Sequence, residues 1–262
     1  MGPGTEQIIR RAWADLLGVA ELGSGSRVLR VNEQADTVSF VQILGQGILS
    51  GPRWALDRAA DLRDEELALL PVLMGLASDH HARPLGAAEL SYTDTPVEHA
   101  DLSTTQDAAA VAALEHACSP EDVEEVGLAG MPHRWVILER ATAGSPVPPV
   151  AVAEHVSAPA ESEEVPVRAE DAEALAESPV PLAGAGYVVW ADALAHMGVL
   201  TNPSARGRGY GVLAAAVGTN AALAAGLIPQ WRARWDNEAS KRLAQALGYE
   251  LAGTQTTVFI DA

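Results

Sequence analysis

One stretch, residues 195–249, constrains the fold of this chain more than any other. Its apolar segment Met197–Thr201 is predicted to be a strand, and the glycine-rich loop Arg206–Gly211 then opens an alanine-rich helix that stops at Gly226. The first N–H groups of a helix have no intrahelical partner and lie at the positive end of its dipole. Glycines leave these donors accessible to a large anion. The loop is therefore predicted to hold a phosphate or pyrophosphate.

The spacing of the glycines narrows the choice of ligand. A mononucleotide P-loop requires a lysine after its last glycine, and this loop has none. Residues 209–214 fit the looser dinucleotide pattern GxGxxA. Only about fifty residues follow the loop, too few for the remaining strands of a doubly wound sheet. A nucleotide such as NAD or ATP stays open as an alternative ligand.

The order of motifs in this stretch resembles the acyl-CoA-binding core of the GNAT superfamily of N-acetyltransferases. The loop of that family begins with Arg or Gln and carries two spaced small residues, its next strand leads to an Asn, and the helix after that opens with a small residue and ends Leu-Gly-aromatic. The corresponding residues here are Arg206, Gly209, Gly211, Asn237, Ser240 and Leu247-Gly248-Tyr249. The resemblance covers roughly residues 90–262 and is strongest from residue 187 onward.

The resemblance implies an α/β (α+β) fold with a mixed, mostly antiparallel GNAT-type sheet and flanking helices. We expect two parts: a smaller N-terminal α/β part, residues 1–92, and the acyl-CoA-binding domain, residues 93–262. An insertion at about 145–182 is rich in proline and acidic residues, a composition typical of a mobile surface loop. A lid over the substrate is the functional alternative for that insertion.

The resemblance also implies a function and a set of site residues. Acetyl-CoA would be the co-substrate and a primary amine the acceptor, with direct attack of the amine on the thioester. Backbone groups of the strand would hold the pantetheine and acetyl carbonyl, the loop would hold the pyrophosphate, and the following helix start would contact the cofactor. The predicted cofactor-binding residues are Val199, Leu200, Thr201, Arg206, Gly207, Arg208, Gly209, Tyr210, Gly211, Asn237 and Ser240.

Two positions that supply acid–base catalysis in many members of the family are empty here. The general-base position holds Ala195, and the position of the tyrosine that protonates the leaving thiolate holds Ala244. His196 is the nearest titratable residue and the candidate catalytic base or relay, although strand alternation directs it away from the face of Ala195. A satisfied core histidine is the alternative for His196. The empty positions also leave open a catalytically inactive CoA-binding sensor or interaction module.

Charge and composition limit the partners. The formal net charge of −18 argues against nucleic acid and anionic membranes. Because CoA is itself polyanionic, its site needs local positive charge, which a cluster of basic residues around the loop would supply: Arg206, Arg208, Arg232, Arg234, Lys241 and Arg242. The lone cysteine, Cys118, fits a reducing cytoplasm. His80-His81 has no third ligand at suitable spacing, so no metal is expected. A homodimer is compatible with this sequence.

Periodicity predicts the remaining elements. We expect helices at 5–22, 54–60, 64–76 and 106–118, the last capped by Ser103 or Thr104, and a further helix starting at Ser119-Pro120. Strands are expected at 27–31, 37–44, 85–92, 134–139 and 186–190, with another conceivable at 150–156. Trp231 and Trp235 alternate with two arginines, which predicts an aromatic stripe facing the core, or alternatively a substrate wall.

Overall fold

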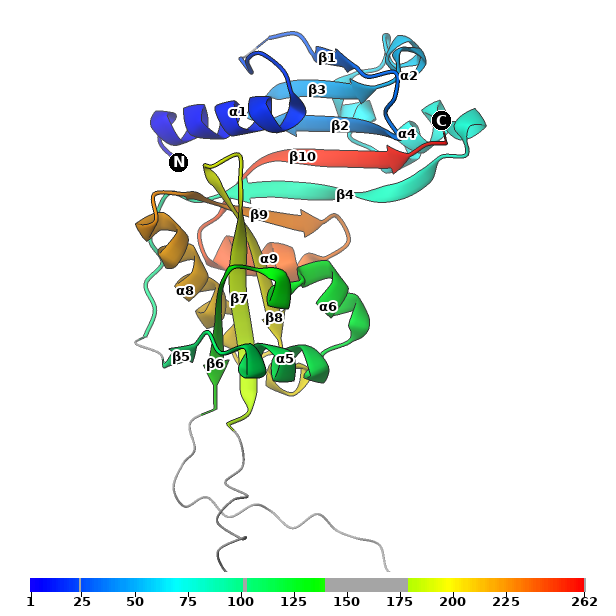
Figure 1. Cartoon of the computed structure of the whole chain (residues 1–262). Helices are drawn as coiled ribbons and strands as arrows, with labels where there is room; N and C mark the ends of the chain where they lie inside the picture. Colours follow the sequence, from blue (N-terminus) through cyan, green and yellow to red (C-terminus); the bar gives the residue numbers. More distant parts are fainter. Residues whose placement is uncertain (24, 101–102, 140–178, 262) are drawn as a thin grey trace, which may run out of the picture.

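The described residues form a ten-stranded sheet (Figure 1). The computed structural model describes residues 1–23, 25–100, 103–139 and 179–261. The strand order is β1-β3-β2-β10-β4-β9-β8-β7-β6-β5. All neighbours are antiparallel except the pairs β1·β3 and β8·β9. The expected fold class, a mixed and mostly antiparallel sheet with flanking helices, is confirmed.

The N-terminal part, residues 1–92, supplies strands β1 to β4, and the short strand β5 follows it. The elements in chain order are α1 (Pro3–Leu17), β1 (Val28–Val31), β2 (Thr37–Ile43), β3 (Gln46–Gly51), α2 (Arg53–Arg58), α3 (Asp64–Leu67), α4 (Leu70–Leu76), β4 (Arg83–Tyr92) and β5 (Thr104–Thr105). The helix α1 ends where Gly18 adopts a left-handed conformation, as the glycine in the sequence indicates.

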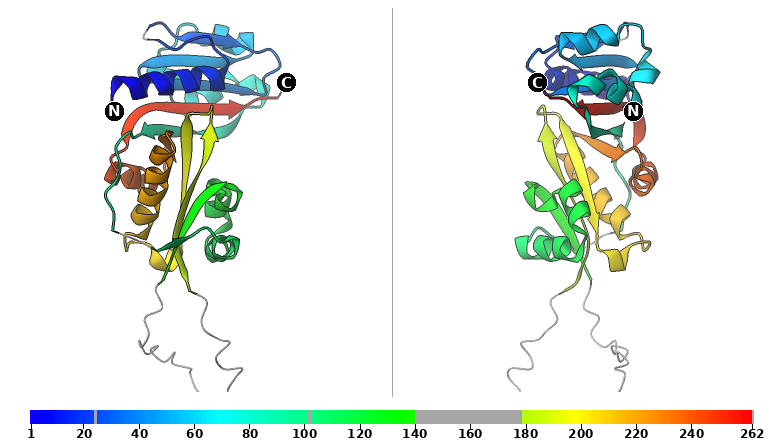
Figure 2. Two further views of the ribbon diagram at one scale, coloured as in Figure 1. Left: turned by 60° about the vertical axis from the view of Figure 1, so that its left-hand side comes forward. Right: turned by 90° about the vertical axis from the view of Figure 1, so that its right-hand side faces the viewer.

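The C-terminal part carries the predicted strand–loop–helix succession. Its elements are α5 (Ala108–Ala117), α6 (Pro120–Val126), β6 (His133–Leu138), β7 (Pro181–Trp190), β8 (Leu194–Thr201), α8 (Tyr210–Ala224), β9 (Ile228–Arg234), α9 (Glu238–Ala246) and β10 (Glu250–Phe259). Helices α8 and α9 lie on one face of this part, and α5 and α6 lie on the other (Figure 2). No helix in the described ranges is both long and apolar enough to cross a bilayer.

Several sequence expectations differ from the structure in identifiable ways. The helix expected at 64–76 is two helices, because Pro71 begins a new one at the start of α4. The cap of α5 is Asp107, whose side chain accepts a hydrogen bond from the N–H of Ala109, and not Ser103 or Thr104. Thr104 instead belongs to the short strand β5. The prediction of a mobile loop at 145–182, and of a strand at 150–156, falls almost entirely outside the described residues.

Strand β10 joins the two parts. It pairs with β2 along residues 253–259 and with β4 along residues 250–259, so the last strand of the chain lies between two strands of the N-terminal part. Strand β4 in turn pairs with β9. The strands β2, β4 and β10 cross the direction of β6–β8 steeply (Figure 1). The sheet therefore bends beside β9, where the candidate site lies.

A polar network fixes the junction between the parts. The buried hydroxyl of Tyr92 accepts hydrogen bonds from Trp13 Nε1 at 2.6 Å and from Gln230 Nε2 at 3.2 Å. These three residues belong to β4, α1 and β9. Burial raises the pKa of the Tyr92 phenol, so the hydroxyl keeps its proton. The network ties α1 and β4 to the strand that borders the candidate site.

Candidate active site

The parallel strands β8 and β9 separate soon after they meet. They pair at only three positions, the last of which is His196 with Gln230. Beyond that point β8 continues to Thr201 paired only with β7, and β9 continues to Arg234 paired only with β4. The separation leaves a wedge-shaped gap whose two walls are unpaired strand edges. Strands β8 and β9 are thus a splayed pair.

Hydrogen-bond alternation shows which backbone groups of β8 face the gap. The N–H of Asn202 donates to the carbonyl of Leu182 on the β7 side. Because the groups of successive residues in a strand point to opposite sides, residues 200 and 202 direct theirs to β7, and Val199 and Thr201 direct theirs toward β9. A ligand in the gap would therefore meet the backbone of Val199 and Thr201, whereas Leu200 would offer only its side chain.

The loop after β8 presents free backbone donors. The buried Asn202 sets the turn, since its side chain donates to the carbonyl of Pro181 and accepts from the N–H of Ser204. Helix α8 then begins at Tyr210, with Gly209 in a left-handed conformation before it. Within the described part of the chain, no hydrogen bond occupies the backbone N–H groups of residues 207–212. These donors at a helix start form an anion site.

The three glycines of the loop have two different roles. Gly207 and Gly209 have φ of +74° and +84°, and a Cβ at either position would meet no atom within 4 Å. They permit the left-handed backbone and leave open space in front of the amides. Gly211 instead allows close packing, because a Cβ there would lie 2.8 Å from Thr201 Oγ1. Because Gly211 has no Cβ, α8 can start directly against β8.

The start of α9 forms the other side of the gap. Asn237 caps this helix by accepting a hydrogen bond from the N–H of Ser240 at 3.0 Å. The hydroxyl oxygen of Ser240 accepts a second bond, from Trp231 Nε1 at 2.9 Å. Since that oxygen already accepts, the Ser240 proton remains available for donation. Trp231 packs in the core against Tyr249, while Trp235 is exposed, so the predicted core stripe holds for Trp231 only.

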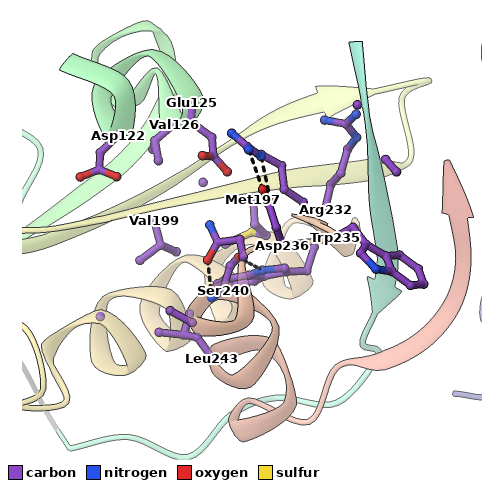
Figure 3. A pocket seen from close by; sticks show the side chains of 18 of the residues that line it. Asp122, Glu125, Val126, Met197, Val199, Arg232, Trp235, Asp236, Ser240 and Leu243 are labelled. Atoms are coloured by element: carbon purple, nitrogen blue, oxygen red, sulfur yellow. Dashed lines mark hydrogen bonds and ion pairs between the residues drawn. The ribbon is translucent and has the colours of Figure 1, made fainter. Parts of the chain in front are cut away.

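One cavity of about 1380 Å³ runs along the gap and joins these features (Figure 3). Asp122 and Glu125 of α6 lie on one side of it, and Arg232, Trp235 and Ser240 lie on the other. The structure brings ten of the sequence-predicted cofactor residues into its wall: Val199, Leu200, Thr201, Arg206, Gly207, Gly209, Tyr210, Gly211, Asn237 and Ser240. Arg208 does not line it and places its guanidinium over the Tyr210 ring instead.

His196 also lines the cavity, in an environment that keeps it neutral. Its ring stacks on Trp190 with centroids 4.0 Å apart, and the buried Nδ1 has no hydrogen-bond partner among the described residues. Burial, assisted by the charge of Arg232, lowers its pKa to about 4. The imidazole is therefore unprotonated at neutral pH, and it is a weak base. A core histidine with all its hydrogen bonds formed, the alternative for His196, would have a partner for Nδ1, and none lies among the described residues.

Three of the six basic residues expected around the loop are already paired with carboxylates. Arg206 binds Asp122 at 2.8 Å, and Arg234 binds Asp236 at 2.9 Å. Lys241 contacts Glu238 and Glu89. These pairs are exposed or partly exposed, so each contributes little to stability and can rearrange around an anion. The unoccupied amides at 207–212, rather than a surplus of cations, are the feature best suited to an anion.

Sequence reasoning missed several residues of the cavity wall. Glu125 of α6 lies in it, as do Thr254 of β10 and parts of the N-terminal half: Gln42 and residues 65, 68–71 and 84–87. Ala195 and Ala244 lie in the core and do not line the cavity, whereas Leu243 does. A helical pattern from Ser119 was available in the sequence, but nothing in it indicated that Glu125 would face the splayed strands.

Comparison with known proteins places the C-terminal part in a family. Residues 180–258 match the family model described as GNAT acetyltransferase. This segment spans the strands β7 to β10 and the helices α8 and α9, and hence the gap, the loop and the Asn237 cap. The resemblance drawn from the loop motif is confirmed. No curated protein matches the sequence.

Solved structures with a similar arrangement are also GNAT proteins. A GCN5-related N-acetyltransferase from Kribbella flavida is 20% identical, with a TM-score of 0.41 over 73% of this chain and 65% of that one. A GNAT-family acetyltransferase from Colwellia psychrerythraea is 13% identical, with a TM-score of 0.43 over 72% of this chain and 61% of that one. A GCN5-related N-acetyltransferase-like protein from Streptococcus suis is 16% identical, with a TM-score of 0.42 over 97% of this chain and 98% of that one. The aligned region spans less than two thirds of the first two proteins.

The chain thus carries an acyltransferase segment. More particularly, residues 180–258 match the GNAT acetyltransferase family, and acetyl-CoA use is implied by that family.

Proposed function

We propose that the protein is an N-acetyltransferase that binds acetyl-CoA in the gap between β8 and β9 and transfers the acetyl group to a primary amine. One observation carries this proposal. The unpaired edge of β8 leads directly to the free amides of residues 207–212, and one cavity follows both. A long ligand with an amide-containing arm and a pyrophosphate matches that succession of donors.

Binding would use each wall of the gap. The pantetheine arm would extend the sheet by hydrogen bonds to Val199 and Thr201, and the pyrophosphate would accept from the loop amides. Leu200 would contribute van der Waals contact alone. Asn237 and Ser240 would border the thioester from the α9 side. Arg206 would exchange its exposed partner Asp122 for a phosphate, and Arg208 would contribute charge at the loop surface.

The chemistry would be a single displacement through a tetrahedral intermediate. The amine nitrogen forms a bond to the thioester carbon, and the carbonyl oxygen becomes an oxyanion that the Val199 N–H can stabilise; one such donor is typically worth roughly 3 kcal/mol. The C–S bond then breaks, giving the acetylated amine and CoA thiol. The proton lost by the amine balances the proton gained by sulfur, for which the Ser240 hydroxyl is a relay.

Deprotonation of the amine would rely on groups other than the usual ones. His196 is neutral but weakly basic, so it can serve as a relay and is a poor proton store. The exposed carboxylate of Glu125, in the opposite wall, is the stronger candidate for attracting the ammonium group and accepting its proton. Positioning beside the thioester would then supply much of the rate enhancement.

A catalytically inactive CoA sensor is the second candidate. It is favoured by the aliphatic residues Ala195 and Ala244 at the family's acid–base positions, both of which are buried. In either case we propose the organisation expected from the sequence, with residues 1–92 and 93–262 as two parts of one continuous sheet. A cytoplasmic protein without nucleic-acid or membrane partners, and free to dimerise, suits the net charge of −18 and the single cysteine.

Acetyl-CoA binding is tested with a matched pair of loop variants. Gly209→Asp and Gly209→Asn place side chains of equal size on the same left-handed backbone, so both carry the same strain. Only the aspartate adds negative charge among the amides, and we expect its dissociation constant for acetyl-CoA to be at least ten times that of the asparagine variant. Equal constants by calorimetry would remove the loop from the site.

Turnover separates the enzyme from the sensor. Release of free CoA thiol is measured over a panel of amines, with thermal shifts by acetyl-CoA, NAD and ATP alongside. Stabilisation by acetyl-CoA alone, with thiol release on an amine, is expected. Stabilisation without turnover on any acceptor would favour the sensor, and stabilisation by NAD or ATP instead would contradict both.

A further inference from the structure

The cavity continues past the splay point into a compartment built by both parts of the chain. There its wall includes Leu69 beside α4, Leu85 of β4 and Trp235 after β9. These three large apolar side chains are exposed by 50%, 52% and 54% of their surfaces. All three line the cavity and provide apolar surface for the body of an acceptor.

Arg232 is the unusual charge in this compartment. Its side chain lines the cavity, and its Nε donates to the amide oxygen of Gln255 at 3.3 Å. Among the described residues, no carboxylate lies within ion-pair distance of it, although the chain has 35 acidic residues. The other two arginines in the wall, Arg206 and Arg234, each have a carboxylate partner.

Arg232 is more buried than the other two arginines of the cavity wall. Burial lowers the pKa of its guanidinium, with the charge of Glu125 acting in the opposite direction, and the charge of Arg232 in turn lowers the pKa of His196. A partly desolvated guanidinium without an anion is costly, and a carboxylate that reaches it gains a short, charge-assisted, bidentate contact.

The position of Arg232 argues against a CoA phosphate as its partner. Extending the register of β8 and β9 from the pair of His196 with Gln230 places Arg232 opposite Gly198. The pyrophosphate amides begin beyond Thr201, at least three residues or about 10 Å further along β8. Arg232 therefore lies near the splay point, where the proposed thioester would sit, on the side open to the acceptor.

From this arrangement we infer that the acceptor is a small amine that also carries a carboxylate, an amino acid in the simplest case, and that the Arg232 guanidinium holds this carboxylate. The inference rests on the proposed function and deepens it. Glu125 across the cavity faces the ammonium end of the same molecule, so the two charges match a zwitterion. The apolar mouth favours amino acids with large aliphatic or aromatic side chains.

The test uses the full chain and compares each amino acid with its α-amide, which lacks only the carboxylate. Thiol release from acetyl-CoA is measured for leucine, phenylalanine and the other proteinogenic amino acids against their amides. For wild type we expect kcat/KM to favour the best amino acid. Because the amine basicity differs within each pair, the decisive quantity is the change in this ratio between protein variants.

Arg232→Gln should lower the acid-to-amide ratio at least tenfold, through a higher KM for the acid and with an unchanged KM for acetyl-CoA. Arg232→Lys should restore part of it. The matched control Arg234→Gln removes an equal charge from the same face of β9, where it is paired with Asp236, and should leave the ratio within twofold. Far-UV circular dichroism and melting temperature verify that each variant folds.

Different results separate this inference from the proposed function. If acetyl-CoA does not bind the wild-type protein, the proposed function fails. If acetyl-CoA binds and reacts with amides or simple amines but with no amino acid, only this inference is overturned. The same holds if acetyl-CoA binds and no amino acid reacts at all. An equal loss on acid and amide in Arg232→Gln also overturns it, since the guanidinium would then act on the thioester oxygen.

Discussion

Protonation of His196 should make the stability of the protein fall between pH 7 and pH 5. The environment lowers the pKa of His196 from 6.5 to about 4 in the folded state. The unfolded chain therefore binds more protons between these values, and the free energy of unfolding decreases as the pH drops from 6.5 toward 4. The full difference of about 2.5 pH units corresponds to about 3.4 kcal/mol. Of this, about 2 kcal/mol is lost between pH 7 and pH 5.

The substitution that isolates this effect is His196→Gln, which removes the titrating ring. Other groups also titrate over this range, so the measured quantity is the change in unfolding free energy from pH 7 to pH 5 in the variant, subtracted from that of wild type. Urea denaturation at the two pH values supplies it. His116→Gln, which removes an exposed imidazole from α5, is the matched control.

Two outcomes would refute the reasoning. One is a variant that loses as much stability on acidification as the wild-type protein. The other is an NMR titration that gives the His196 imidazole a pKa near 6.5, which would mean that water or a carboxylate reaches Nδ1. In the active enzyme the same low pKa has a kinetic consequence. An acid limb of kcat/KM near pH 6.5 cannot then be attributed to His196.

Two further substitutions test the packing that holds the site. Tyr92→Phe should cost about 2–4 kcal/mol, because the indole of Trp13 and the amide of Gln230 both lose their buried acceptor; a loss below 1 kcal/mol in urea denaturation would show that water replaces the hydroxyl. Gly186→Ala should destabilise by about 1–3 kcal/mol, because a Cβ there overlaps the backbone oxygen of His133 and crowds Met131. Gly130→Ala is its control, since a Cβ at that position meets nothing within 4 Å, and equal melting temperatures for the two variants would contradict the packing argument.

The loop side of the cavity could be predicted from the sequence because its determinants are local. Three loop glycines, the Asn202 turn and the Asn237 cap each act within a few residues of themselves, and their spacing fixes where the free amides lie. A helix start after a strand requires little information from the rest of the chain. That is why ten predicted residues lie in one cavity wall.

The central strand β10 could not be placed by the same means. Its sequence, ELAGTQTTVF, alternates only weakly and contains a glycine, and no helical or strand pattern singles it out. It becomes a strand because β2 and β4, more than 150 residues earlier in the chain, present two open edges to it. Strand β3 was also missed, although it forms a local hairpin with β2 and pairs in parallel with the short β1.

The acceptor side of the site depends on exactly such distant pairings, so the sequence left it unspecified. Arg232 reaches the cavity because β4 and β10 extend the sheet past β9, and Gln255 of β10 supplies its one hydrogen bond. Leu85 and Leu69 come to the same mouth through β4 and α4 of the N-terminal part. In the proposed reaction, the segment 180–258 would account for the thioester half. The N-terminal part completes the cavity wall, so under that proposal it would contribute to substrate choice as well as to folding.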